Sequence, residues 1–239
     1  MVLRIIDIET TGVDPEKDAI IEIASVDLVR VGLTSGESAA ITFDIQNEQE
    51  HLVNPGREIP PEATAVHHIM DIDVHCKPFL ADVLPHYKGA DFYIAHNSLF
   101  EESFLHEFLG GPKWIDTYRC ALRVWPEAPG HSNQVLRYWL GFANPFGRHR
   151  NGIDPHRALS DCIVTAAILA RLIEKASWAD LQRWSSEPAL FTTFSFGKHK
   201  GDRWDAHPNY LDWIINKSDF DENTKWCARY WLDNRRQAA

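Results

Sequence analysis

Several protein classes are excluded by what this chain lacks. Its four cysteines lie far apart and form no CxxC pair, so neither a zinc site nor a disulfide framework is expected. No stretch approaches the roughly 18 consecutive apolar residues of a membrane helix. Charged residues also interrupt the short apolar segment at the N-terminus, which argues against a signal peptide. We therefore expect a cytoplasmic protein that acts without a membrane and without a small organic cofactor. Nothing in the sequence indicates an oligomeric state.

Positive charge is also scarce. The 239 residues hold 24 Lys and Arg against 34 Asp and Glu, a formal net charge of -10, which argues against a broad nucleic-acid-binding face. An acidic site that holds metal ions is compatible with this balance. The last fifty residues differ, because they hold eight Lys or Arg against seven Asp or Glu and four of the nine tryptophans. We expect a domain over residues 1–185 and a small aromatic-rich module over residues 186–239.

The spacing of apolar residues predicts an α/β fold. Strands in close succession near the N-terminus indicate an antiparallel meander. Alternating strands and helices follow, so we expect a mixed β-sheet flanked by helices, with a small α+β module at the C-terminus. The expected strands lie at 3–9, 20–29, 39–46, 51–55, 90–97 and the start of 114–126. The expected helices lie within 59–70, at 99–110, at the end of 114–126, and at 132–141 and 156–175, with a hairpin and two helices in the tail.

Asp7 and Glu9 interrupt the first strand. Residues two apart in an extended chain share a face, so these carboxylates lie side by side among isoleucines. Adjacent carboxylates repel each other and cost free energy unless a positive group lies between them. A strand with one solvated face is the alternative interpretation.

Two further segments carry unusual polar residues. In "AHNSLFEESFL", Ser98 and Glu101 match a helix capping box, which gives Glu101 an ordinary structural interpretation. In "DPHRALSDCIVTAAILA", Asp161 is the only charged residue over 160–170, where a carboxylate can also serve the helix dipole. His156 precedes it by five residues, about 140° around a regular helix. His156 must therefore lie on a loop or first turn.

Together these residues indicate metal-dependent chemistry at a phosphate. Carboxylate oxygens suit two hard cations such as Mg²⁺, for which Mn²⁺ can substitute. Two ions about 4 Å apart stabilise the attacking and leaving oxygens of a phosphoryl displacement. A histidine with a pKa of about 6.5 can take a proton from the attacking water. The groups available are Asp7, Glu9, Glu101, Asp161 and His156.

The same segments resemble a known family. "DIETTG", "AHNSLFE" and "HRALSD" are similar to the three motifs of the DnaQ-like, DEDDh-type 3'→5' exonucleases, and "VNPGREIPPEATAVHHI" resembles their linking segment. The tail "FTTFSFGKHKG…PNYLDWI" resembles the C-terminal extension of a DNA-degrading member. The resemblance implies a ribonuclease H-like sheet, two Mg²⁺ ions, and hydrolysis of DNA from its 3' end to nucleoside 5'-monophosphates.

The resemblance also implies roles for individual residues. It makes His156 the general base and gives the metal ligands as Asp7, Glu9, Glu101 and Asp161. Contacts with the terminal nucleotide are implied for Thr10, Thr11, Gly12, Val13, His67, Asn97 and Phe100. One position departs from the family, because Glu101 stands where Asp is usual. The extra methylene moves the carboxylate by about an ångström, and Mg²⁺ demands near-octahedral geometry, so we expect an active enzyme with an altered second metal site.

Other functions stay open at this point. The RNA-degrading branch of the superfamily shares the motifs, although no residue indicates recognition of a 2'-OH. A catalytically impaired nucleic-acid-binding relative would account for Glu101. A protein-interaction scaffold would use the Trp-rich tail, whose tryptophans otherwise fill its own core. For the tail we expect contacts with the phosphate backbone from Lys198, His199, Lys200 and Arg203.

Overall fold

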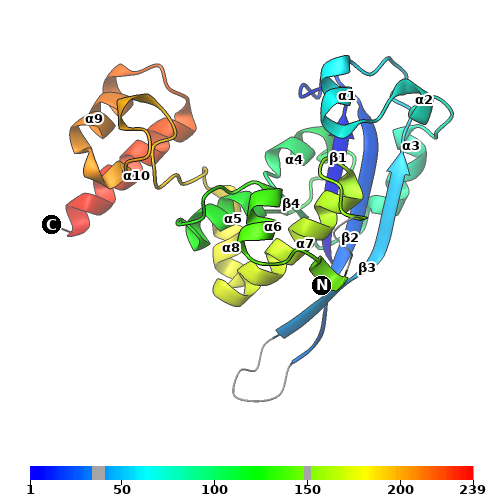
Figure 1. Cartoon of the computed structure of the whole chain (residues 1–239), viewed down its shortest axis with the longest axis horizontal. Coiled ribbons are helices and arrows are strands. Elements are labelled where there is room, and N and C mark those ends of the chain that lie inside the picture. Colours follow the sequence, from blue (N-terminus) through cyan, green and yellow to red (C-terminus); the bar gives the residue numbers. More distant parts are fainter. Residues whose placement is uncertain (34–40, 148–151, 239) are drawn as a thin grey trace.

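A five-stranded mixed sheet organises the protein (Figure 1). The computed structural model describes residues 1–33, 41–147 and 152–238. The strands are β1 (Leu3–Thr10), β2 (Ile20–Leu33), β3 (Ile41–Leu52), β4 (Phe92–Ala95) and β5 (Trp114–Asp116), in the spatial order β3-β2-β1-β4-β5. The pairs β1–β2 and β2–β3 are antiparallel, whereas β4 runs parallel to both β1 and β5. The expected meander and mixed sheet are confirmed.

The helices connect and cover these strands. Those between the strands are α1 (Pro61–His67), α2 (Asp71–Val74), α3 (Leu80–Val83), η1 (Leu84–Tyr87) and α4 (Leu99–Leu105). After β5 come α5 (Thr117–Val124), α6 (Asn133–Trp139), η2 (Pro145–Gly147), α7 (Ala158–Lys175) and α8 (Trp178–Ser186). The tail holds η4 (Gly197–His199), η5 (Trp204–Ala206), α9 (Pro208–Lys217) and α10 (Glu222–Ala238). Over the described ranges, no helix is long and apolar enough to cross a bilayer.

Two expectations about these elements are wrong. The separate strand at 51–55 does not form, because β3 continues to Leu52 and Val53 then leaves the ladder with its N–H donated to the carbonyl of Ile21 at 2.9 Å. The helix expected over 99–110 ends at Leu105 and continues as turns, so Phe108 is 49% exposed rather than packed in the core. Of the expected third strand, residues 39 and 40 lie outside the described residues.

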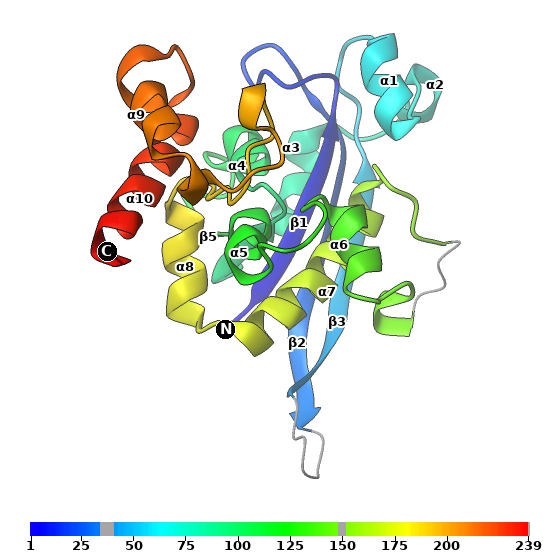
Figure 2. The ribbon, with the colours of Figure 1, turned by 60° about the vertical axis from the view of Figure 1, so that its left-hand side comes forward.

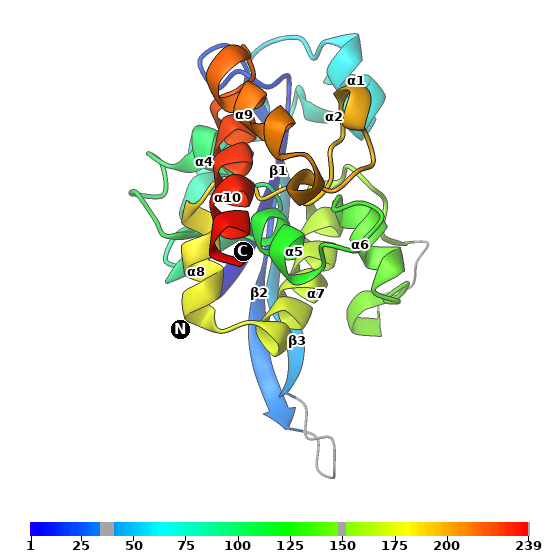
Figure 3. The same cartoon turned by 90° about the vertical axis from the view of Figure 1, so that its left-hand side faces the viewer.

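The two faces of the sheet carry different layers. On one face α7 crosses β1, β2 and β3, and α5, α6 and α8 extend the same core; Figure 3 shows these helices in front of the strands. On the other face Ile6 and Ile8 pack with α3, η1 and α4. Leu3 and Ile5 point into the α7 layer. Asp7 and Glu9 continue that face because strand residues alternate, so the acidic pair lies at one end of a buried strand face.

The C-terminal residues have a hydrophobic cluster of their own, which consists of Leu190, Phe194, Trp204, Leu211, Ile214, Cys227 and Ala228. This part of the chain lies beyond α5 and α8, at one end of the long axis of the molecule (Figures 1 and 2). The expected hairpin is present as a single antiparallel bridge between Thr193 and Arg203, and two helices follow it as expected. Arg123 of α5 anchors the junction, because its Nη2 lies 2.9 Å from Glu187 and its guanidinium 5.9 Å from the Trp226 ring centre.

Candidate active site

Three carboxylates from distant parts of the chain meet where α7 begins. Asp7, Glu9 and Asp161 each place a ligand oxygen within 4.8 Å of the other two. Asp7 and Glu9 are the two residues of β1 that are not fully buried, and Asp161 lies in the first turn of α7, which crosses that strand face. The interpretation of Asp7 and Glu9 as a solvated strand face is therefore wrong.

Burial and mutual repulsion raise the pKa values of these carboxylates. Burial raises the pKa of Asp7 well above its usual range, and Asp161 is the neighbouring charge that adds most. Burial also raises the pKa of Glu9 to about 8, again with Asp161 as the leading neighbour. The pKa of Asp161 itself is raised by burial, although hydrogen bonds from its surroundings oppose the shift. Carboxylates in this situation hold either a proton or a cation at neutral pH.

Glu101 of α4 belongs to the same acidic group. It is only 4% exposed, and its Oε2 has no hydrogen-bond partner among the described residues. Burial raises its pKa to about 8, and Asp116, Glu9 and Asp161 add to the shift. Its neighbour Glu102 instead pairs with His106, Nδ1 to Oε1 at 3.5 Å. Glu101 therefore faces the acidic group and Glu102 does not.

The capping-box interpretation of Glu101 is wrong. Ser98 is the N-cap residue of α4, but its side chain makes no capping hydrogen bond. The dipole interpretation of Asp161 is incomplete for a similar reason, since its carboxylate lies against Asp7 and Glu9 rather than standing alone at the helix start.

The donor set fits a divalent cation. Every converging atom is a carboxylate oxygen, which is the ligand type that hard cations such as Mg²⁺ prefer. A buried carboxylate oxygen without a partner costs free energy, and among the residues that the structure describes the Oε2 of Glu101 is such an atom. A cation at Asp7, Glu9 and Asp161, within reach of Glu101, would relieve both the repulsion and the unpaired oxygen.

His156 lies in the turn that precedes α7, as the spacing predicted. Its φ is 58°, and its backbone N–H donates to Oδ2 of Asp161 at 2.9 Å. The backbone thus ties the histidine to the acidic group, while the residue itself is exposed to solvent. A group that exchanges protons with water requires this exposure.

Two residues that sequence reasoning missed hold this turn. Glu22 of β2 is fully buried and accepts three hydrogen bonds from the guanidinium of Arg157, at 2.6 to 3.2 Å. The same carboxylate accepts the backbone N–H of Ala158 at 2.9 Å. Glu22 is the one charged residue in "IIEIASV", and this isolation in an apolar strand is the signal that could have identified it.

Amide side chains at the start of α6 were also missed. Gln134 donates from Nε2 to Oδ1 of Asp161 at 3.3 Å, and Asn133 donates to Oγ1 of Thr165 on the same helix at 3.1 Å. Both residues lower the pKa of Asp161 and so favour its charged form. They orient a carboxylate that the sequence had already singled out.

The loop after β1 is tightly constrained. Thr10 donates its hydroxyl to the Gly12 carbonyl, and Thr11 donates its hydroxyl to Oδ1 of Asp18 at 3.0 Å. A Cβ at Gly12 would lie 2.4 Å from Oδ2 of Asp18, so no larger residue fits there without rearrangement. Val13 is 82% exposed at the tip. The threonine side chains are thus engaged within the loop, and Val13 is the side chain free to meet a ligand.

The remaining candidates differ in accessibility. His67 is buried, with Nδ1 accepting the N–H of Ile69 at 3.0 Å, and burial lowers its pKa. Asn97 is exposed at a φ of 74°, and its N–H donates to Oδ1 of Asp116 at 3.1 Å. Phe100 is half-buried against Phe104, with ring centres 5.2 Å apart. Asn97 therefore offers its side chain to solvent, whereas His67 and Phe100 are mostly enclosed.

This chain is similar to known exonucleases in sequence and in fold. A family model described as exonuclease (RNase T) matches residues 5–169. Exodeoxyribonuclease 10 of Escherichia coli K12 is 37% identical over 241 residues, which cover 97% of this chain and 99% of that protein. A DNA polymerase III subunit epsilon from Treponema pallidum is 31% identical over 147 residues, 57% of this chain and 62% of that protein.

Solved structures show the same fold. A structure of exonuclease X in complex with 5' overhanging duplex DNA superposes with a TM-score of 0.58 at 35% identity, covering 77% of this chain and 99% of that chain. An Escherichia coli exonuclease I structure superposes with a TM-score of 0.55 at 15% identity and supports the fold alone. The fold, the converging acidic residues and the similarity over nearly the full length lead to one assignment: this chain belongs to the exonuclease family of DnaQ-like, ribonuclease H-like nucleases, whose members depend on divalent metal ions.

Proposed function

We propose that this protein is a 3'→5' exodeoxyribonuclease that hydrolyses the terminal phosphodiester bond of DNA and releases nucleoside 5'-monophosphates. The observation that carries the proposal is the meeting of Asp7, Glu9 and Asp161 close to Glu101, whose buried Oε2 has no hydrogen-bond partner in the described part of the chain. DNA as the substrate is supported by the name of the 37% identical relative and by the duplex DNA in the exonuclease X structure.

The four carboxylates together provide the ligands for the metal ions. Asp7, Glu9, Glu101 and Asp161 would hold two Mg²⁺ ions, or Mn²⁺ in their place, and the bound ions supply polarisation of the phosphate and a more acidic water. Glu101 approaches from α4 on a side chain one methylene longer than Asp, so the second site differs in shape from the usual one. Because its carboxylate is buried and close enough to raise the pKa of Asp7, this difference is compatible with activity.

His156 acts as the general base. The turn that carries it is fixed by Asp161 through the His156 N–H and by the pair of Glu22 and Arg157. The exposed imidazole takes a proton from the attacking water and passes it to solvent, which a histidine can do near neutral pH.

The terminal nucleotide binds beside the loop after β1. Val13 is exposed at the tip of this loop, where it can contact the terminal base. Thr10, Thr11 and Gly12 shape the loop and offer their backbone groups to the nucleotide. Asn97 and Phe100 come from the segment after β4 that also carries Glu101, and buried His67, the last residue of α1, lies close to the backbone of Thr10 at the end of β1. The free cysteines, three of which are buried, fit the reducing cytoplasm as the working compartment.

One assay tests the proposal. Single strands of DNA and of RNA with the same sequence, labelled at the 3' or the 5' end, are incubated with Mg²⁺, Mn²⁺ or EDTA and with wild type or Asp7→Ala. We expect metal-dependent release of a labelled mononucleotide from 3'-labelled DNA, shortening from the 3' end, and no reaction with EDTA or with Asp7→Ala. Faster digestion of RNA would support the exoribonuclease alternative. Binding of the 3' end without any release under Mn²⁺ would support the catalytically impaired alternative.

A further inference from the structure

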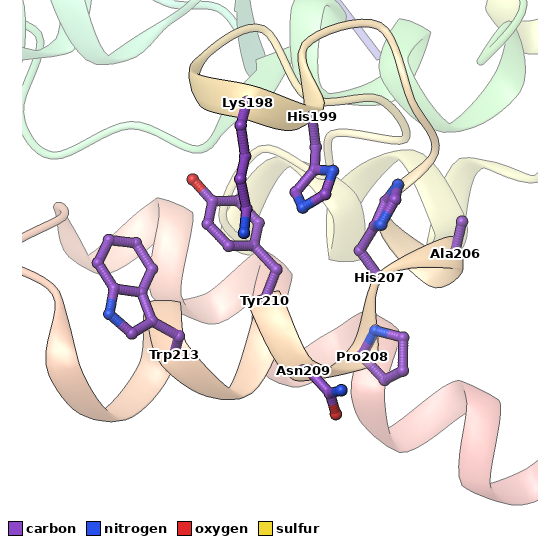
Figure 4. Close-up of a pocket in the computed structure, with 8 residues that line it drawn as sticks. All are labelled: Lys198, His199, Ala206, His207, Pro208, Asn209, Tyr210 and Trp213. Atoms are coloured by element: carbon purple, nitrogen blue, oxygen red, sulfur yellow. The ribbon is translucent and has the colours of Figure 1, made fainter.

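A pocket opens in the C-terminal part, away from the acidic residues. It has a volume of about 680 Å³ and lies between the turn of η4 and helix α9. Figure 4 shows Lys198 reaching down from η4 across the ring of Tyr210, with Trp213 to the left of that ring and two histidines, His199 and His207, to its right. The volume is in the range of sites that bind small ligands.

The pocket has a rigid frame. Phe194 and the segment after the turn exchange two backbone hydrogen bonds, at 2.9 Å with Asp202 and 2.8 Å with Gly201. Gly197 has a φ of 66°, and a Cβ there would lie 2.8 Å from the Tyr210 hydroxyl oxygen, so glycine lets the turn approach α9 closely. The His199 ring stacks on His207 with centres 3.8 Å apart. The turn is therefore docked on α9 in a defined position.

The lining combines aromatic surface with positive charge. The rings of Tyr210 and Trp213 are parallel within 10°, with centres 5.4 Å apart. Trp213 remains 42% exposed although it is a large apolar side chain. The Nζ of Lys198 lies 5.4 Å from the Tyr210 ring centre. A flat aromatic surface beside an ammonium group suits a nucleobase and its phosphate, because any base can stack and any phosphate can pair with lysine.

One expected contact is not part of this pocket. Arg203 was expected to contact phosphate, but its guanidinium is held by Asp205 at 3.1 and 2.7 Å and lies 5.8 Å from the Trp231 ring centre. Arg203 lies outside the lining of the pocket, and its expected contact with phosphate stays a prediction. Lys198 lines the pocket and supplies its positive charge.

We propose that this pocket is a second binding site, which takes an unpaired segment of DNA by stacking a base on Trp213 and pairing a phosphate with Lys198. The proposal rests on DNA being the substrate. A single strand is favoured over a duplex because stacking needs a base that is free of its partner, and DNA over a protein because the residues from 190 onward carry a net charge of +1 while the rest of the chain carries -11. The pocket-bearing part lies at one end of the long axis (Figure 1), so only a strand long enough to reach it benefits.

Binding is measured with the full-length protein in EDTA, by fluorescence anisotropy of a labelled single strand of about 20 nucleotides, a length chosen to exceed a typical single-strand site. EDTA stops hydrolysis and also removes any cation from the grouping of His199, Asp202 and His207. We compare wild type with Trp213→Ala and Lys198→Ala. Lys217→Ala is the control, because it removes one exposed charge from α9 outside the pocket.

Trp213→Ala should weaken binding about tenfold, as expected for one lost base–aromatic stack, and Trp213→Phe should restore most of it. Lys198→Ala should lower the slope of log affinity against log salt by about 0.7, whereas Lys217→Ala should bind like wild type. Melting temperatures identify any variant that fails to fold. In Mg²⁺, Trp213→Ala should raise KM for the long strand and leave turnover of a trinucleotide unchanged.

The outcomes separate this proposal from the proposed function. Wild-type affinity of folded Trp213→Ala and Lys198→Ala for the long strand would overturn the second site even if the protein hydrolyses DNA. Failure of the wild type to hydrolyse DNA, together with the loss of binding in Trp213→Ala, would overturn the exodeoxyribonuclease proposal and keep the second site.

Discussion

Arg157 places its guanidinium on the buried carboxylate of Glu22, with Nη2 2.6 Å from Oε1. The pair joins the second strand to the turn that carries His156, and Glu22 stands directly opposite Glu9 in the β1–β2 ladder. The charge of Arg157 lowers the pKa of Glu9 while that of Glu22 raises it. One ion pair therefore fixes the position of His156, the proposed base, and its two charges act in opposite directions on the pKa of Glu9, a proposed metal ligand.

Glu22→Gln tests this positioning role. The substitution leaves the guanidinium without its ionic partner, and breaking a buried pair costs about 3–5 kcal/mol. Because Arg157 is partly exposed, we expect a smaller loss of about 2–3 kcal/mol in the free energy of unfolding. We also expect a fall in kcat of about tenfold or more with little change in KM, as for residues that orient a metal site. Unfolding in urea and steady-state kinetics measure both.

The control for Glu22→Gln is Glu174→Gln on α7. Glu174 pairs with Arg171 at 3.2 Å on the exposed side of that helix, where such pairs contribute about 0–1 kcal/mol. If Glu22→Gln loses stability but keeps the wild-type kcat, the pair is only structural.

Glu101 and Glu102 provide a matched pair in the second motif. We expect Glu101→Ala to abolish hydrolysis, because its buried carboxylate faces the acidic group, and Glu102→Ala to retain it, because Glu102 pairs with His106. Glu101→Asp should keep activity and change the ratio of Mg²⁺- to Mn²⁺-supported rates, since metal geometry depends on side-chain length. The reverse result, with Glu102→Ala inactive, would contradict the placement of α4.

The raised pKa values predict how stability changes with pH in the absence of metal. The folded protein holds protons on Glu9 and Glu101 up to a pKa of about 8, whereas the unfolded chain loses them near pH 4. Stability in EDTA should therefore fall as pH rises from about 4 to 8 and then level off. We expect the melting temperature to fall by about 5 °C or more across this window. Added Mg²⁺ should raise it most at pH 8, where fewer protons compete.

Asp7→Asn separates stability from activity. The amide removes a charge from the centre of the acidic group, where burial and neighbouring carboxylates raise the pKa of Asp7. At pH 8 in EDTA the variant should melt several degrees higher than wild type, and in Mg²⁺ it should show no hydrolysis. A lower melting temperature in EDTA would contradict this expectation, because it would show that a positive group already compensates the charges.

Deletion of residues 190–239 tests the role of the tail in DNA binding. The remaining chain loses Lys198 and Lys200 together with the pocket at α9. Affinity for single-stranded DNA should fall, and the dependence of log affinity on log salt should become flatter. An unchanged salt slope, with the shortened protein folded as judged by circular dichroism, would argue against phosphate contacts in the tail.

The sequence was sufficient for residues whose chemistry contrasts with their surroundings. Asp7, Glu9 and Asp161 stand out as charges in apolar segments, and the five-residue spacing placed His156 off the helix correctly. It was insufficient where a role depends on a distant partner. Glu22 and Arg157 lie 135 residues apart, so neither predicts the other.

The predicted ends of two secondary-structure elements were also wrong. Leu105 ends α4 although helical spacing continues to Leu109, because the chain there turns towards the glycines at 110 and 111 with φ of 80° and 67°. His51 and Leu52 remain paired with β2, so β3 is one long strand instead of two short ones. The length of β3 is decided by its pairing with β2, which local spacing does not contain, whereas the end of α4 is decided by the turn at two glycines that the sequence itself shows.

The four scattered cysteines have a practical consequence. Cys76 is exposed, just after α2, whereas Cys120, Cys162 and Cys227 are buried. Burial raises the pKa of Cys120 to about 12 and that of Cys227 to about 11, and it raises the pKa of Cys162 as well. Because the thiolate is the reactive form, a maleimide dye at neutral pH should attach at one position. The natural chain thus carries its own attachment point for a fluorophore, from which energy transfer to dye-labelled DNA can follow the strand without any substitution.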